Sequence, residues 1–221
     1  DGLANLTNIT RLNLHCESLT NLDGLGSLTH LTYLNISYCK STNLNVLVNL
    51  TGLTVLELYK CESLTNLDDL ANLTNLTTLY LKGCVSLTNV DSLANLTNLN
   101  ILSITGNAIE TLDGFAKNPT FDNLNVTNLS NLKELYLGAC EALTNINGFA
   151  NLTKLNKLDL RGCESLSNIA DLADLPNLTT LRLSAYSLTH FNAVETPTNI
   201  ITLDLSRDIM TKFPVIPKFF V

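Results

Sequence analysis

Six cysteines and three histidines are the residues of this 221-residue chain with the widest chemical range, because both types bind metals and cysteines also form disulfides. Five of the cysteines occupy one position of a recurring phrase, which reads LKGCVSL around Cys84. They are Cys39, Cys61, Cys84, Cys140 and Cys163. Side chains at one position of stacked repeats run parallel instead of pointing at each other. We therefore expect all six thiols to be reduced, and these five to be buried as small hydrophobic residues.

The histidines do not suggest a metal site. His15, His30 and His190 are far apart and occupy different positions of the recurring phrase, so their side chains are not expected to converge. The chain also has no Gly-rich phosphate loop and no His-Glu spacing of a metal hydrolase. The many Ser and Thr residues have no histidine at a matching position. We expect no metal, no cofactor and no enzymatic activity.

Charge and composition exclude two further classes. The net charge is −7, only 15% of the residues are charged, and Lys and Arg form no cluster, which argues against nucleic acid as the partner. No run of about 18 apolar residues is present, so membrane insertion is not expected. The first residues, Asp1–Leu6, already read as the middle of a repeat. We expect a single repeat domain over 1–221, cut from a longer protein and monomeric.

The recurring phrase is Leu-x-x-Leu-x-Leu, with apolar substitutions. Its middle leucines are separated by 22, 22, 23, 23, 33, 23, 23 and 22 residues. They are Leu12, Leu34, Leu56, Leu79, Leu102, Leu135, Leu158, Leu181 and Leu203. Such regularity is the mark of a repeat architecture, in which stacked copies bury a continuous core.

Each copy contains two rhythms. The alternation Leu79-x-Leu81 has the period of two that is typical of a strand with one buried face. After the cysteine the period becomes three, as in Leu67, Leu70 and Leu73. Three residues per turn fit a 3₁₀-like return path and not an α-helix. The pattern predicts a solenoid of about nine parallel strands on a concave side, with mainly 3₁₀ or turn returns on the convex side.

Asparagine recurs at the expected corners. One set precedes an apolar residue after the cysteine, as Asn43 and Asn66 do, and another precedes the strands, as Asn75, Asn98 and Asn131 do. Asparagine satisfies backbone groups that turns leave unpaired, so both sets are interpreted as structural. Asn-x-Ser/Thr sequences are also frequent, but they are part of the repeat. We expect several of their asparagines to be buried, which favours a prokaryotic source.

These features resemble the leucine-rich-repeat superfamily over essentially the whole chain. The phrase LANLTNLTTLYL at 70–81 and the short period resemble the bacterial internalin type, with cysteine in place of a consensus asparagine that survives at Asn107. The phrase LKGCVSL also resembles repeats of plant intracellular immune receptors. The missing return-side proline and the Leu-Thr-Asn-Leu phrases favour the bacterial type. The resemblance implies a right-handed superhelix of the α/β kind.

The resemblance also implies a function. An internalin-like protein is expected to be a non-enzymatic module that binds another protein on its concave face, within a bacterial surface or secreted adhesin or effector. The plant-like phrase implies an alternative, a cytoplasmic sensor or regulatory domain. The targeting part of a larger enzyme is the third possibility.

Strand residues that alternate with the buried leucines form the concave surface. An aromatic and apolar zone is expected from tyrosines with Lys82, Val55 and Ile101, because tyrosine is favoured at binding hot spots. A charged zone of Lys157, Asp159, Arg161, Arg182 and Asp204 alternates in sign and is expected to pair mainly with itself. The proposed partner-binding residues are Tyr33, Tyr59, Tyr80, Lys82, Tyr136, Arg161 and Arg182.

Two segments break the repeat. The interval of 33 residues between Leu102 and Leu135 contains Phe121–Val126, which imitates a strand, but Pro119 favours an excursion. We expect the strand of Leu102 to be followed directly by that of Leu135, with 115–128 as an irregular insertion on the return side. The apolar run at 213–221 contains two prolines. We expect 207–221 to cover the last coil as a cap.

Overall fold

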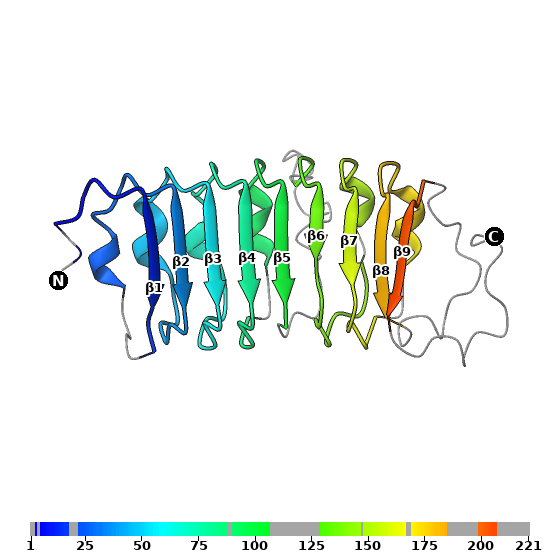
Figure 1. Cartoon of the computed structure of the whole chain (residues 1–221), viewed down its shortest axis with the longest axis horizontal. Helices are drawn as coiled ribbons and strands as arrows, with labels where there is room; N and C mark the ends of the chain where they lie inside the picture. The colour runs from blue at the N-terminus through cyan, green and yellow to red at the C-terminus, as the bar shows by residue number, and fades with distance from the viewer. Residues whose placement is uncertain are drawn as a thin grey trace, which may run out of the picture.

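The structure is a computed structural model that describes residue 3 and residues 5–17, 22–87, 90–106, 129–146, 148–166, 169–184 and 199–206. In this part of the chain nine strands form one sheet in chain order, and all pairs are parallel (Figure 1). The strands are β1 (Arg11–His15), β2 (Tyr33–Ser37), β3 (Val55–Tyr59), β4 (Thr78–Lys82), β5 (Ile101–Thr105), β6 (Glu134–Tyr136), β7 (Lys157–Leu160), β8 (Thr180–Ser184) and β9 (Thr202–Ser206).

The register of the sheet is set by the repeat. Leu34 pairs with Leu12 on one side and with Leu56 on the other, and the same row continues strand by strand to Leu203. A slip by one residue would turn every leucine of a strand to the outer face. Burial of the leucines therefore holds the register, and the predicted arrangement of strands is confirmed.

The return paths consist of 3₁₀ turns. Along the third return, the N–H groups of Leu70, Leu73 and Leu76 each bond the carbonyl of the leucine three residues earlier. The 3₁₀ helices are η1 (Asp23–Leu25), η2 (Asn45–Asn49), η3 (Asp68–Leu70), η4 (Asp91–Asn95), η6 (Phe149–Asn151) and η7 (Ala170–Asp174). The predicted period of three is confirmed. Within the described ranges there is no α-helix, and none of the helices is long and apolar enough to cross a membrane.

The core is a continuous column of leucine between the sheet and the returns. Leu56, Leu70, Leu79 and Leu93 are completely buried. Full burial of one such side chain stabilises the fold by about 1.5–3 kcal/mol. Leu12 and Leu14 on β1 are only partly buried, because β1 has a neighbouring described strand on one side only. Stability therefore comes from each coil lying between two others.

Asparagines at the corners bond backbone carbonyls of the neighbouring coil, as expected. The side-chain N–H of Asn75, Asn98 and Asn131 donates to the carbonyl oxygens of Thr51, Thr74 and Thr97 at 2.9 Å in each case. These bonds tie the corner before each strand to the preceding coil. The expectation that several Asn-x-Ser/Thr asparagines are buried is wrong. None of the described ones is buried, and two of them, Asn75 and Asn177, donate to carbonyls at the edge of the preceding coil.

The long interval does not interrupt the sheet. β5 pairs directly with β6, with Leu102 opposite Leu135, which confirms the predicted strand order. The expected insertion at 115–128, the consensus asparagine Asn107 and the expected cap at 207–221 lie outside the described residues.

Neighbouring residues on β4 test the alternation of core and surface. Leu79→Ala is expected to lower the free energy of unfolding by about 2–5 kcal/mol, because it leaves a cavity in the leucine column. Tyr80→Ala, one residue later and 36% exposed, is expected to cost less than about 1 kcal/mol. Urea unfolding followed by circular dichroism measures both. Equal losses would contradict the assignment of Tyr80 to the outer face.

Candidate functional site

The outward residues of the sheet form three rows that cross the strands. The first row runs through Tyr33, Val55, Thr78 and Ile101, as the register shows. The middle row runs through Glu57, Tyr80, Ser103, Tyr136, Asp159, Arg182 and Asp204. The third row runs through Ser37, Tyr59, Lys82 and Thr105. These are the columns expected from the sequence.

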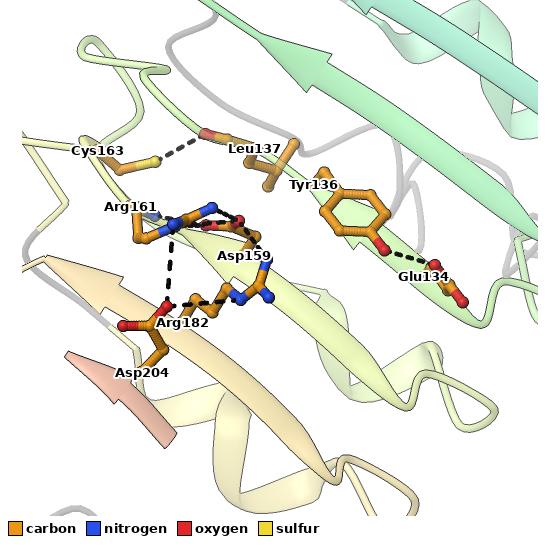
Figure 2. A network of polar contacts seen from close by, with 8 residues as sticks. All are labelled: Glu134, Tyr136, Leu137, Asp159, Arg161, Cys163, Arg182 and Asp204. Carbon is orange, nitrogen blue, oxygen red and sulfur yellow. Dashed lines mark hydrogen bonds and ion pairs between the residues drawn. The ribbon is translucent and has the colours of Figure 1, made fainter. Parts of the chain in front are cut away.

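Two of the predicted tyrosines stand close together. Tyr80 and Tyr136 occupy the middle row with only Ser103 between them. The Tyr136 hydroxyl donates a hydrogen bond to Glu134 (Figure 2). Glu134 also accepts one from Lys157 at 2.8 Å. Burial and the bond to Glu134 raise the pKa of Tyr136 to about 12. The bonds from Lys157 and Tyr136 lower the pKa of Glu134. Tyr136 is thus a neutral phenol in a fixed orientation.

The other predicted tyrosines are separate. Tyr33 is half-buried on β2, with the guanidinium of Arg11 4.0 Å from its ring centroid. Tyr59 lies in the third row, with the ammonium of Lys82 5.6 Å from its ring centroid. Tyr33 and Tyr136 are four strands apart, which corresponds to about 19 Å at about 4.8 Å per strand. The aromatic residues therefore extend along the face from β2 to β6 and do not form one cluster.

The charged zone pairs with itself, as the alternation of sign predicts. Arg161 contacts Asp159 at 2.6 Å, and Arg182 lies 3.6 Å from Asp159 and 3.7 Å from Asp204 (Figure 2). Asp159 is only 5% exposed although it faces outward, because the two arginines cover it. Arg161 and Arg182 therefore form a fixed, nearly neutral surface over β7–β9.

The sequence interpretation missed two residues at the corners. Tyr38 and Lys60 directly follow β2 and β3, so they belong to no strand column. The Tyr38 ring lies 4.8 Å from the His15 ring and 5.5 Å from the Tyr59 ring, centroid to centroid. A signal was available, because the same corner carries glycine in other repeats, as at Gly83. A large side chain at a glycine position indicates that the side chain itself has a role.

All six cysteines are free and buried, which includes the five expected from the repeat. Four of them donate from Sγ to a carbonyl of the preceding repeat, within or directly after its strand, at 3.1–3.8 Å: Cys61 to Ile36, Cys84 to Leu58, Cys140 to Ile104 and Cys163 to Leu137. A thiol is a weak donor, but these bonds satisfy carbonyls inside the column. In the described parts of the chain, no group of three or more His, Cys, Asp or Glu is arranged to hold a metal.

The thiols predict a response to alkaline pH. Burial raises the pKa of Cys163 to about 12, compared with about 8.5 for an unperturbed thiol. A folded-state pKa above the unfolded value adds stability that is complete below about pH 8.5 and is lost as the pH rises toward 12. Cys163→Ala is therefore expected to unfold with a shallower decline in stability between pH 8 and about 10. Urea midpoints at several pH values measure it. Leu160→Ala, buried but not ionisable, should retain the wild-type slope, and identical slopes for both variants would refute the role of this thiol.

Comparisons with known proteins agree with this geometry. A family model described as leucine-rich repeats in two copies matches residues 74–117. No curated protein matches the chain. Among solved structures, internalin C2 from Listeria monocytogenes is 27% identical, with a TM-score of 0.58 over 93% of this chain and 74% of that one.

Two further structures have the same fold. The leucine-rich-repeat domain of the type III effector XopL is 22% identical, with a TM-score of 0.70 over 94% of this chain and 80% of that one. The functional domain of InlJ from Listeria monocytogenes, which includes a cysteine ladder, is 23% identical, with a TM-score of 0.59 over 82% of this chain and 37% of that one. The repeat, the single parallel sheet and these similarities show a leucine-rich-repeat solenoid, and the chain is similar to an internalin.

Proposed function

We propose that this chain is a non-enzymatic recognition module that binds a protein partner on the outer face of its sheet. Leucine-rich-repeat domains commonly act in protein–protein interaction, which supports the general assignment. The observation that carries the proposal is the set of outward tyrosines on β2, β3, β4 and β6. They belong to the face of the sheet opposite to the 3₁₀ returns, which lie behind the strands in Figure 1. Tyrosine combines large contact area with a hydroxyl and loses little rotamer entropy on binding.

The proposed contact residues differ in what they offer. Tyr80 and Tyr136 provide the central aromatic pair, with the Tyr136 hydroxyl held by Glu134. Tyr33, Tyr59 and Lys82 extend the contact toward β2 and β4. Arg161 and Arg182, already neutralised by Asp159 and Asp204, bring a polar edge with little long-range attraction. Such a division into an aromatic centre and a polar rim is typical of protein interfaces.

The setting is proposed from the relatives. We propose a bacterial surface or secreted protein, of the adhesin or effector kind, that acts as a monomer. The similarity to an internalin from Listeria monocytogenes supports this setting. A cytoplasmic sensor domain and the targeting part of a larger enzyme are the alternatives. Sequencing of the gene on both sides of this segment distinguishes them, because a wall anchor, a nucleotide-binding domain or a catalytic domain would each appear there.

The tyrosines can be tested together. In Tyr59→Ala/Tyr80→Ala/Tyr136→Ala, the fold should persist because none of the three belongs to the leucine column. Loss of one hot-spot tyrosine costs about 2 kcal/mol or more, which is about thirtyfold in affinity, so the triple variant should lose more than about thirtyfold. The partner is first identified by crosslinking the wild-type protein to the cells or extracts in which it acts. The captured protein is then titrated with the wild type and with the variant to compare their affinities.

The matched control carries three alanine substitutions on the return side. Asn72→Ala/Asn95→Ala/Asp174→Ala removes exposed side chains around η3, η4 and η7 and should bind like the wild type. If the tyrosine variant keeps wild-type affinity, the sheet-face assignment is wrong. If the control loses affinity instead, the partner binds on the return side.

A further inference from the structure

The corner after each of the strands β2–β7 has a left-handed backbone, and Ala139 adopts it after β6 with a φ of 58°. Gly83, Gly106 and Gly162 adopt φ values of 69°, 64° and 75° there. Tyr38 and Lys60 occupy the same corner with φ values of 60° and 50°. Glycine reaches this region without cost, whereas other L-residues do so with strain. Residues held in such backbone are concentrated at functional sites, so the side chains of Tyr38 and Lys60 point to a role beyond the fold.

The two corner side chains join three strand residues in one cluster. The His15, Tyr38 and Tyr59 rings form a chain, with centroids 4.8 Å and 5.5 Å apart. The ammonium of Lys60 lies 5.3 Å from the Tyr38 centroid and 5.9 Å from the Tyr59 centroid, and that of Lys82 lies 5.6 Å from Tyr59. The five residues, His15, Tyr38, Tyr59, Lys60 and Lys82, are called the corner cluster below.

Gly83 makes room for this arrangement. The next corner in the stack lies against Lys60, and a Cβ added at Gly83 would come within 3.3 Å of Lys60 Cγ. Gly83 therefore has two effects. Glycine suits the left-handed backbone at this position, and the absence of a side chain leaves room for the methylene groups of Lys60. The large corner residues Tyr38 and Lys60 are followed by the small Gly83, and the Lys60 ammonium lies near the rings of both Tyr38 and Tyr59.

The corner cluster carries positive charge that the described residues do not neutralise. Lys60 and Lys82 are exposed, and neither has a carboxylate partner within the described ranges. Of the nearby acidic side chains, Glu57 accepts from Asn35 at 2.7 Å and Glu17 contacts His15 at 3.1 Å, while the exposed Glu62 forms no ion pair with either lysine. At the opposite end of the sheet Lys157, Arg161 and Arg182 all have carboxylate partners. In a chain of net charge −7, this corner is distinguished by two ammonium groups that lie beside one aromatic ring, that of Tyr59.

The chemistry of the corner cluster selects its partner. Stacking of a sugar needs an open aromatic face, but ammonium groups already lie over the rings of Tyr38 and Tyr59. Ammonium groups with aromatic edges beside them suit carboxylates that alternate with apolar side chains. Complementary charge at the edge of an interface accelerates association and excludes wrong partners.

We propose that the corner cluster docks an acidic segment of the protein partner. This inference rests on the proposed function, since it assigns a chemical character to the protein bound on the sheet face. Tyr59 and Lys82 belong both to the proposed binding face of the sheet and to the corner cluster, so the two surfaces are continuous. A partner that follows the sheet from Tyr136 toward Tyr59 would place its acidic segment over Lys60.

The test uses a defined probe, a short peptide in which glutamate alternates with leucine, with a glutamine version as its neutral match. Nuclear magnetic resonance of protein labelled in its tyrosine rings should show peptide-dependent shifts at Tyr38 and Tyr59. Lys60→Gln/Lys82→Gln should weaken binding about tenfold, which is the combined effect of two exposed ion pairs. Lys133→Gln/Lys154→Gln makes the same charge change away from the corner cluster and should bind like the wild type.

A single variant separates binding from folding. Lys60→Gly should keep or raise the thermal midpoint, because glycine suits the φ of 50°, and should still lose affinity for the acidic peptide. Equal binding by Lys60→Gln/Lys82→Gln and wild type would overturn the proposal. So would shifts confined to Tyr80 and Tyr136, or tighter binding of a heparin fragment than of the peptide at Tyr38 and Tyr59. The proposed function is tested separately by the affinity of Tyr80→Ala/Tyr136→Ala for the natural partner, because neither residue belongs to the corner cluster. Wild-type affinity of this variant would contradict the proposed function and not the role of the corner cluster.

Discussion

Every coil of this protein depends on its neighbours for burial of its leucines. One copy of the repeat presents apolar side chains at both of its flat edges, and only another copy can cover them. The completely buried row from Leu34 through Leu79 to Leu135 is the result of that stacking. Stability is then close to a sum of interfaces between adjacent coils. The partial exposure of Leu12 and Leu14 on β1 shows what a coil loses when a described neighbour is present on one side only.

Stacking also determines where polar groups can go. Carbonyls at the coil corners need donors from the next coil, and the repeat supplies them in two ways. Asn98 donates a carboxamide N–H to Thr74 on the outer edge, and Cys163 donates a thiol to Leu137 inside the column. Because both are bonds between adjacent coils, they strengthen the same interfaces that bury the leucines. The cysteines are thus part of the stacking, and burial raises the pKa of Cys163, which keeps that thiol protonated.

Packing fixes the residues on the inner side of the sheet, whereas the residues on the outer face can differ from strand to strand. The outer face over β7–β9 and the outer face over β2–β4 differ in how their charges are paired. Over β7–β9 the charges neutralise each other through Asp159, Arg161 and Arg182. Over β2–β4 the ammonium groups of Lys60 and Lys82 lie over aromatic rings without carboxylate partners. The positive charge over β2–β4 is therefore available to attract a partner, whereas the charges over β7–β9 largely neutralise each other.

The sequence by itself determined the fold, because a period of two followed by a period of three leaves one way to bury every leucine. The strands, their order across the interval from Leu102 to Leu135 and the outward rows all followed from spacing alone. Only the tertiary structure decided which outward side chains meet, since contacts across strands depend on rotamers and on corner geometry. In the structure Tyr33 and Tyr136 lie far apart on the sheet face, whereas Tyr38 and Lys60 lie next to Tyr59. The tertiary structure also left the Asn-x-Ser/Thr asparagines at least partly exposed, as in Asn75, whose amide donates to Thr51 at the coil edge. Spacing identifies the residues that face inward, whereas the contacts among outward residues arise from the fold in three dimensions.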